Sequence, residues 1–291
     1  MKVAIKNISH AITLAPKQYE AAHLKLIKST QGNDLAILQD FEAHSLSEQN
    51  SASLMDRMDS KYLLPMKDFN SLMQDIASNY TILNSGGKRI FHYQTTYFDN
   101  KQRRFYLDHH NGKLNRYKVR FRRYVESNMG YMEVKFKNNN KRTIKQRIPM
   151  DCILPDQIRV NEFIRETLGY STKFETALFV NYQRITLLNN SSNNKERITI
   201  DLNLSFRNAI DQTQSIQDKV FIIEIKQDRK AVSSPCRQQL KARGYHDLNF
   251  SKYCIGSVLT NTNNNDESMK PLKSNRFKNV LRQLNKFNEL H

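Results

Sequence analysis

The chain has 291 residues, of which 46 are Lys or Arg and 28 are Asp or Glu, so its formal net charge is +18. A hydrophobic fraction of 38% excludes a wholly disordered chain, and the absence of any run of about 18 apolar residues excludes a transmembrane helix. The N-terminal segment lacks the apolar core of a secretory signal, and the three cysteines form neither a disulfide framework nor a metal-binding pair. These features predict a reduced, cytoplasmic protein with a polyanionic partner.

The first 50 residues predict short helices. Leu24 and Ile27 recur at helical spacing, and Leu35 and Phe41 belong to a second apolar group after a Gly-containing break. Residues 1–50 are therefore expected to form a helical extension of the domain that follows.

Between residues 51 and 260 the pattern changes to short alternating runs, which predict antiparallel strands joined by hairpins. Two helices are expected to interrupt the strands, at about 67–80 and at about 156–168, the second with Ile158, Phe163 and Ile164 as its apolar residues. Turns are expected at three Asn-containing stretches, 84–87, 138–140 and 189–194.

Residues 261–291 predict a linker followed by a basic helix. The helix should lie between about 272 and 290, where an apolar stripe comprises Phe277, Val280, Leu281 and Leu284. Two interpretations stay open: a helix docked on the domain, or a free helix that meets an anionic membrane surface or an emerging polyphosphate chain.

The predicted strands share one composition. Successive side chains of a strand point to opposite faces, and in these strands one face is apolar while the other carries cations with single acids. The run 116–122 shows the pattern, with four basic side chains alternating with three apolar ones. Across the strands, the charged faces are expected to comprise Arg57, Asp59 and Lys61; Arg116, Lys118, Arg120 and Arg122; Glu133, Lys135 and Lys137; Arg197, Asp201 and Arg207; and Glu224 and Lys226.

Two arrangements of these strands are open. An ordinary sheet would turn its charged face to water, although a solvated face more often mixes Lys and Glu evenly. In the alternative, the sheet curls into a barrel whose charged faces point inward, and helices cover the apolar faces outside. Inward cations would repel one another and lose hydration, so such a barrel would need a polyphosphate ligand. Its few carboxylates could then hold a hard divalent metal.

Eight short motifs in collinear order resemble the VTC-type polyphosphate polymerase domain, over roughly residues 52–260. They are Arg57-Met58-Asp59-Ser60-Lys61-Tyr62, Tyr97-Phe98-Asp99, Lys118-Val119-Arg120-Phe121-Arg122, Glu133-Val134-Lys135, Tyr182-Gln183-Arg184, Arg197-Ile198-Thr199-Ile200-Asp201, Ile223-Glu224-Ile225-Lys226 and Phe250-Ser251-Lys252-Tyr253. That domain belongs to the triphosphate tunnel metalloenzymes, a CYTH-like superfamily. The resemblance therefore implies an α+β fold in which an antiparallel β-barrel tunnel is flanked by helices.

The resemblance also implies roles for the matching positions. Six cations would act on the reacting phosphates: Lys61, Arg120, Arg122, Lys135, Lys226 and Lys252. Further side chains would bind phosphate oxygens: Arg57, Lys118, Lys137, Arg184, Arg197, Arg207 and Ser251, the last at the start of a helix that Lys252 opens. Glu224 would be the main ligand of Mn²⁺ or Mg²⁺, with Glu133 as a second ligand and Asp201 as the least certain of the three.

One departure from the wider superfamily bears on the reaction. Many hydrolytic tunnel enzymes open with Glu-x-Glu-x-Lys, where this chain has Arg57-x-Asp59-x-Lys61. The missing first acid favours the VTC-like branch, so we expect a metal-dependent polymerase that transfers the γ-phosphate of ATP to a growing polyphosphate chain. A tripolyphosphatase or nucleoside triphosphatase on the same fold stays open, as does a non-catalytic polyanion-binding module.

The expected partners are ATP and polyphosphate, and any membrane link would require a membrane-protein partner. Nucleic acid is disfavoured except for nonspecific binding. Recognition of single strands uses aromatic rings beside the basic groups. In this chain the aromatic residues that alternate with the cations are expected on the opposite face: Tyr117, Phe121, Phe136 and Phe206. His109 and His110 are expected to lie in a turn, without a ligand role.

Overall fold

The computed structural model describes residues 33–51, 57–140, 142–152, 157–170, 173–191, 196–228, 234–261 and 272–289. The strands are β1 (Glu42–His44), β2 (Arg57–Pro65), β3 (Tyr80–Leu83), β4 (Phe91–Asp99), β5 (Arg116–Tyr124), β6 (Met129–Lys137), β7 (Thr143–Met150), β8 (Glu175–Asn189), β9 (Glu196–Asn208), β10 (Gln214–Gln217) and β11 (Val220–Asp228). The α-helices are α3 (Leu46–Ser51), α4 (Phe69–Ile76), α5 (Arg104–His110), α6 (Gln157–Leu168), α7 (Pro235–Ala242), α8 (Lys252–Leu259) and α9 (Lys278–Glu289). The 3-10 helices are η1 (Asn33–Asp40), η2 (Met66–Asp68), η3 (Ala77–Asn79) and η4 (Asn275–Phe277).

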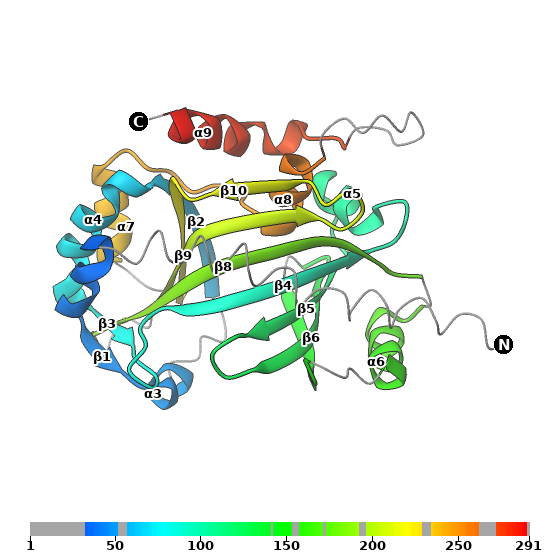
Figure 1. Cartoon of the computed structure of the whole chain (residues 1–291), viewed down its shortest axis with the longest axis horizontal. Helices are drawn as coiled ribbons and strands as arrows, with labels where there is room; N and C mark the ends of the chain where they lie inside the picture. The colour runs from blue at the N-terminus through cyan, green and yellow to red at the C-terminus, as the bar shows by residue number, and fades with distance from the viewer. Residues whose placement is uncertain are drawn as a thin grey trace.

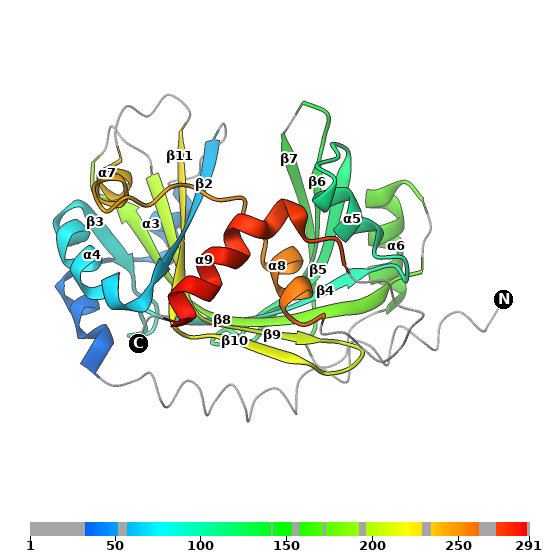
Figure 2. The same ribbon diagram turned by 90° about the horizontal axis from the view of Figure 1, so that it is seen from above.

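One 11-stranded sheet organises these elements (Figure 1). Its main path runs β2-β11-β9-β8-β4-β5-β6-β7 with antiparallel neighbours, whereas the short strands β1 and β3 pair in parallel. Figure 2 shows β2 and β11 on one side and β5, β6 and β7 on the other, both rising from a floor of β8 and β9. The end strands β2 and β7 do not pair with each other, so the sheet curls without closing. The predicted antiparallel fold flanked by helices is confirmed, as an open barrel.

The N-terminal predictions are met in part. The helix expected around Leu24 and Ile27 lies outside the described residues, and the apolar group from Leu35 to Phe41 falls largely in the 3-10 helix η1.

The turn expected at 84–87 is present, because Gly86 and Gly87 have φ values of 58° and 75°. Those left-handed conformations favour glycine, and they bring Ser85 and Lys88 into a β-bridge.

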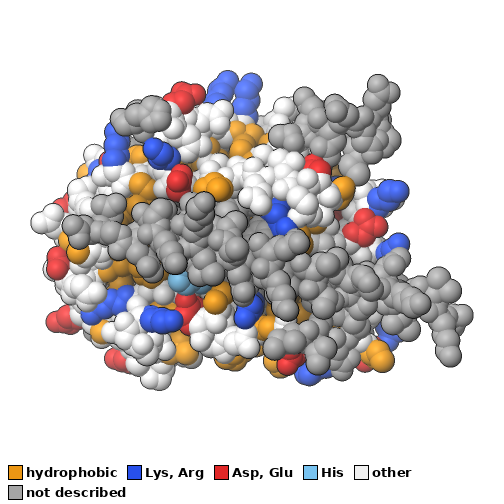
Figure 3. Space-filling view, viewed as in Figure 1, with side chains coloured by type: hydrophobic (Ala, Val, Ile, Leu, Met, Phe, Trp, Pro, Cys, Tyr) orange, Lys and Arg blue, Asp and Glu red, His pale blue; other side chains and the backbone are white. Residues whose placement is uncertain are grey.

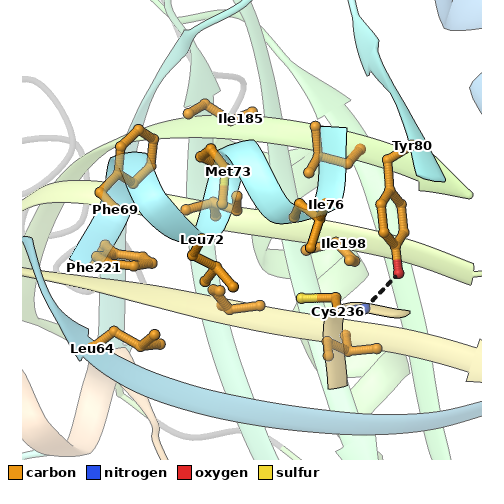
Figure 4. Close-up of a cluster of buried hydrophobic side chains, with 14 of the residues drawn as sticks. Leu64, Phe69, Leu72, Met73, Ile76, Tyr80, Ile185, Ile198, Phe221 and Cys236 are labelled. Atoms are coloured by element: carbon orange, nitrogen blue, oxygen red, sulfur yellow. Dashed lines mark hydrogen bonds between the residues drawn. The ribbon is translucent and has the colours of Figure 1, made fainter. Parts of the chain in front are cut away.

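Helix α4 covers one face of β2, β11, β9 and β8, which we call the outer face (Figure 4). Its buried residues are the apolar face of the predicted 67–80 helix: Phe69, Leu72, Met73 and Ile76. They pack with Leu64, Ile198 and Phe221 of three neighbouring strands. Nearby, the Tyr80 hydroxyl accepts a hydrogen bond from the backbone N–H of Cys236 at 3.1 Å. This bond connects α7 to the first residue of β3.

Helix α6 covers the outer face at the other end of the sheet. Val160, Ile164 and Leu168 pack in one cluster with Val119 of β5 and with residues of β6. The helix was predicted correctly at about 156–168, and of its expected apolar residues Ile164 and Phe163 pack in this cluster. Ile158 does not, because it is 68% exposed.

Helices α8 and α9 lie on the opposite face of the sheet, as alternation along β11 shows. Phe221 and Ile223 belong to the α4 cluster, whereas Ile222 between them packs with α8 and α9. At Gly256 of α8, an added Cβ would lie 2.3 Å from a Phe206 ring carbon, so this close helix–sheet approach requires glycine.

Helix α9 is docked rather than free. Its side chains Val280, Leu284 and Phe287 are buried, as is Phe277 of η4 just before it, and α9 contacts β2 and β11. This decides between the two interpretations of the C-terminal segment. Among the described residues, no helix combines the length and the apolar character needed to cross a membrane.

Strand β9 changes face at Asn203. The register between β9 and β8 shifts by one residue there, and Asn203 has a φ of 50°, as expected for a β-bulge. The side chains therefore change sides: Ile198, Ile200 and Leu202 join the α4 cluster, whereas Leu204 and Phe206 join the α8 cluster. The expectation that Phe206 lies on the face opposite the cations is therefore wrong.

Candidate functional site

The charged sides of the strands continue from one strand to the next. Directly paired residues on neighbouring strands share a face, and the register pairs charged residues repeatedly. The pairs are Lys61 with Glu224, Lys226 with Arg197, Asp201 with Arg184, Arg120 with Glu133, and Lys118 with Lys135. These side chains therefore share the face that the outer helices leave uncovered.

That face is the inner side of the curled sheet. Strands β11 and β6 have four strands between them in the sheet order, yet Glu224 and Lys135 influence each other's pKa. Burial disfavours the charged form of Glu224, but Lys226, Lys61, Arg184 and Lys135 hold its pKa well below the ordinary value. The two halves of the charged surface thus face each other, and we call this surface the concave face.

Burial distinguishes the concave face from a solvated sheet surface. Arg120, Arg122 and Lys226 are each 8% exposed, which excludes the interpretation in which the charged face points to water. By contrast, the side of the molecule seen in Figure 3 carries basic and acidic side chains interspersed over its described part, as on an ordinary soluble surface.

Asp201 is buried in an ion-pair network at the base of the concave face. It is 0% exposed, accepts hydrogen bonds from Arg184 Nε and Nη2 at 2.6 and 2.9 Å, and also pairs with Lys252. Burial alone would raise its pKa, but these cations lower it to about 2. Asp201 therefore stays ionised and holds Arg184 and Lys252 in place.

Glu133 plays the same part in the other half of the sheet. It is 0% exposed, accepts a hydrogen bond from Arg120 Nε at 2.6 Å, and pairs with Lys145 of β7. Burial disfavours its ionisation, but Arg120, Arg122 and Lys145 hold its pKa far below the ordinary value. Glu133 therefore holds the cations of Arg120 and Lys145 in place.

Glu224 differs from the other two acids. Its oxygens lie 3.5 Å from Lys61 Nζ and 3.2 Å from Lys226 Nζ, and its side chain is 17% exposed, against 0% for Glu133 and 1% for Asp201. Within the part of the chain that the structure describes, no three His, Cys, Asp or Glu side chains gather as a metal site. Mg²⁺ and similar ions are commonly held by one or two carboxylates together with substrate phosphates, and Glu224 fits that mode of binding.

A row of lysines crosses β5, β6 and β7. Lys118 lies opposite Lys135, which lies opposite Lys145, and like charges directly opposite each other destabilise a sheet. Burial lowers the pKa of Lys118 and of Lys145, and Arg120 and burial hold that of Lys135 well below its ordinary value. On β11, burial, opposed by Glu224, lowers the pKa of Lys226 to about 8. Burial and neighbouring cations therefore disfavour the charged forms of these lysines, and an anion bound to the concave face would oppose that effect.

Helix α8 begins beside this row. Ser251 caps the helix by accepting from the backbone N–H of Cys254 at 3.3 Å, and its hydroxyl oxygen receives a hydrogen bond from Lys118 Nζ at 3.1 Å. Lys252 Nζ lies 4.6 Å from the centre of the Tyr182 ring. Ser251 and Lys252 therefore lie together at the concave face, next to Lys118 and Asp201.

Two of the sequence motifs meet in a structural contact. The carboxylate of Asp99 accepts hydrogen bonds from the backbone N–H groups of Phe105 and Tyr106 at 3.0 Å each, and from the Tyr253 hydroxyl at 2.6 Å. Asp99 thus caps α5 and joins it to α8, which explains the Tyr97-Phe98-Asp99 motif without a role in binding phosphate.

The remaining predicted phosphate ligands fall in different places. Arg197 lies opposite Lys226, and Lys137 lies opposite Arg116 at the start of β5. Arg57 begins β2, but its side chain lies outside the described part of the chain. Arg207 is not brought to the concave face: the bulge at Asn203 turns it to the outer face, over the Phe179 ring at 4.6 Å. The expectation that Arg207 shares the face of Asp201 is therefore wrong.

Sequence reasoning missed residues on β7 and among the tyrosines. Lys145 pairs with Glu133, and Arg147 lies opposite Glu133 in the strand register. The alternation along Thr143–Met150 could have predicted this strand and its two cations. Tyr93 stacks on Tyr182 at 5.2 Å, with the Arg184 guanidinium within 5.2 Å of both ring centres. Aromatic rings are thus present on the concave face, but they pack on each other and on cations. His109 and His110 end helix α5 instead of lying in a turn.

Comparison with known proteins identifies the family. The model of the VTC domain matches residues 56–261. Solved structures of similar fold include a putative adenylyl cyclase of Hippeastrum described as having a dominant triphosphatase activity, at 13% identity and a TM-score of 0.39 over 69% of this chain and 95% of that one. A putative adenylate cyclase of Vibrio parahaemolyticus has 10% identity and a TM-score of 0.37 over 66% and 85%. The PH1012 protein of Pyrococcus horikoshii has 12% identity and a TM-score of 0.35 over 65% and 90%. No curated protein matches.

Proposed function

The chain belongs to the VTC domain family, and we propose that its concave face binds ATP and a linear polyphosphate chain and transfers the γ-phosphate of ATP to the end of that chain. The terminal phosphate oxygen of the chain attacks the γ-phosphorus, the bond from that phosphorus to the β–γ bridging oxygen breaks, and ADP leaves. Such transfers depend on positioning and charge neutralisation more than on a protein nucleophile, and the concave face supplies both.

The lysine row carries the proposal. Lys118, Lys135 and Lys145 lie side by side on three strands, and the pKa of each is lowered. A polyphosphate chain offers several negative charges in a line, so it would offset repulsion along the whole row. A single small anion would neutralise one position only.

Arg122 supports the same ligand. Its Nε is buried and has no hydrogen-bond partner among the described residues, and its guanidinium lies 5.5 Å from the centre of the Tyr93 ring. An unpartnered buried donor is costly, and a phosphate oxygen is a strong acceptor for it. Arg122 and Lys135 would therefore hold phosphate oxygens directly, with Arg120 held rigid by Glu133.

Glu224 would hold a divalent cation together with phosphate oxygens, and Lys61 and Lys226 lie on either side of it. Bound there, Mn²⁺ or Mg²⁺ would neutralise charge on the phosphates and favour their alignment for transfer. Asp201 and Glu133 are poorer candidates, because each already pairs closely with two protein cations.

The test is to incubate the purified chain with ATP and Mn²⁺ or Mg²⁺ and identify the products. Long polyphosphate with ADP is the expected result. Orthophosphate with ADP would overturn the polymerase proposal in favour of a triphosphatase, and phosphate binding without turnover would make the chain a binding module.

Variants locate the activity on the concave face. Glu224→Gln should abolish turnover and leave tripolyphosphate binding largely intact, whereas Arg122→Ala should weaken binding. Arg165→Ala, an exposed position on α6, is the matched control and should change neither. Arg120 is a poor probe, because its removal would leave the buried Glu133 carboxylate without its 2.6 Å partner.

A further inference from the structure

The segment before α9 is fixed against α5. Phe277 is 0% exposed, and its ring centre lies 6.2 Å from that of Tyr106 and 6.0 Å from that of His109. The Tyr106 hydroxyl donates a hydrogen bond to the carbonyl of Lys273 at 2.7 Å. These contacts hold the 272–277 segment in one position, beyond the residues that the family model matches.

This docking places Arg276 over the connection between α5 and β5. A Cβ added at Gly112 would lie 2.5 Å from Arg276 Nη1, so the guanidinium rests on the backbone of that glycine. Strand β5 starts shortly after, at Arg116, whose neighbour across the sheet is Lys137.

Five basic groups converge there. Burial lowers the pKa of His109, and Lys118, Arg116, Arg276 and Lys137 lower it further. His109 Nδ1 is also buried without a hydrogen-bond partner among the described residues. The cluster joins α5, β5, β6 and the C-terminal segment, and it has the composition of an anion site.

Asp108, an acid that influences Arg116, pairs with other cations. Burial and Arg276 lower the pKa of Arg116, and Asp108 opposes that lowering only in part. The contacts of Asp108 are to Arg104 at 3.1 Å and to Lys113 at 3.3 Å. The excess positive charge around Arg276 is therefore not offset by these protein contacts.

The cluster is continuous with the concave face through Lys118. That lysine bonds to Ser251 at the start of α8 and lies opposite Lys135, and Arg116 precedes it by two residues on the same side of β5. We propose that Arg276, with Arg116 and Lys137, forms a second phosphate subsite over which a long polyphosphate chain passes, whereas a tripolyphosphate on the concave face does not reach it. This inference rests on the proposed function for its ligand.

The test compares two ligand lengths by calorimetric titration of the full chain. Arg276→Ala should weaken binding of long-chain polyphosphate about tenfold, as loss of one charge-assisted contact would, and should lower the salt dependence of binding. Its affinity for tripolyphosphate should stay at the wild-type value. Arg276→Lys should retain most of the long-chain affinity, and Arg282→Ala, an exposed position on α9, should retain all of it.

Three results would overturn the subsite: unchanged long-chain affinity in Arg276→Ala, an equal loss in Arg282→Ala, or an equal loss for tripolyphosphate. Melting curves of Arg276→Ala verify that Phe277 still docks the segment. Failure of the proposed function gives a different outcome, in which the wild-type protein forms no polyphosphate from ATP. If Arg276→Ala then still loses affinity for long-chain polyphosphate but not for tripolyphosphate, the subsite is supported.

Discussion

Replacing Asp201 by Asn would remove the negative charge between Arg184 and Lys252. The pKa of Asp201 is lowered from 3.8 to about 2, and each pKa unit corresponds to about 1.4 kcal/mol, so the surroundings favour the ionised form by about 2–3 kcal/mol. Removing one partner of a buried ion pair costs about 3–5 kcal/mol, because the opposite charges stay buried. We therefore expect Asp201→Asn to lower the free energy of unfolding by about 3 kcal/mol, which lowers the melting temperature by roughly 6–12 °C.

Urea unfolding of the full chain, with and without tripolyphosphate, measures this effect. The control is Asp75→Asn, which removes a 41% exposed carboxylate paired with Arg243 and should cost less than about 1 kcal/mol. Tripolyphosphate should stabilise Asp201→Asn more than the wild type, because the ligand supplies negative charge to a surface that has lost some of its own.

The pH dependence has a definite sign. Because the folded-state pKa of Asp201 is depressed, its contribution to stability is fully present above about pH 4 and is lost as the pH falls through about 2. The stability difference between Asp201→Asn and the wild type should therefore narrow over that interval. The account of Asp201 would be refuted if Asp201→Asn were as stable as Asp75→Asn. It would also be refuted if the stability difference between Asp201→Asn and the wild type stayed constant down to about pH 2.

Three further predictions concern single residues. The pKa of Lys226 is about 8, so tripolyphosphate affinity should fall between about pH 7 and about pH 9, and Lys226→Arg should flatten that fall in calorimetric titrations. Burial raises the pKa of Glu196, so the stability that its neutral form contributes is lost as the pH rises through the raised pKa. Glu196→Gln keeps an acceptor for the Tyr80 hydroxyl. It should therefore raise the melting temperature at about pH 8 but not at about pH 4. Gly256→Ala should lower the free energy of unfolding by about 1–3 kcal/mol, measured in urea, because its Cβ would overlap the Phe206 ring.

Much of the fold could be predicted from alternation and spacing. The strand around Arg120 and the helix around Leu72 follow from local patterns of two and about 3.6 residues, and the shortage of acids on the charged faces indicated that they point inward. These signals are carried by neighbouring residues, so the sequence displays them directly.

The pairing of the acids could not be predicted in the same way. Glu133, Asp201 and Glu224 look alike in sequence, each on the charged side of a strand. What separates them is burial and partner distance across strands, which leaves Glu224 more exposed and more loosely paired. Arg207 was misplaced because one residue in a left-handed conformation, Asn203, reverses the alternation after it. Asn tolerates that conformation better than most residues, but its presence alone does not locate a bulge.

The extra residue at Asn203 makes the length of β9 as important as its composition. If Asn203 instead took an ordinary extended place in the ladder, strict alternation would continue through it, so Leu204 and Phe206 would leave the packing under Gly256 and Arg207 would take their place. The bulge therefore lets even-numbered apolar residues of one strand serve both faces of the sheet, packing under α4 before Asn203 and under α8 after it. An alignment that gives a relative without this bulge a residue at the Asn203 position would shift every later residue of the strand by one and assign its side chain to the wrong side.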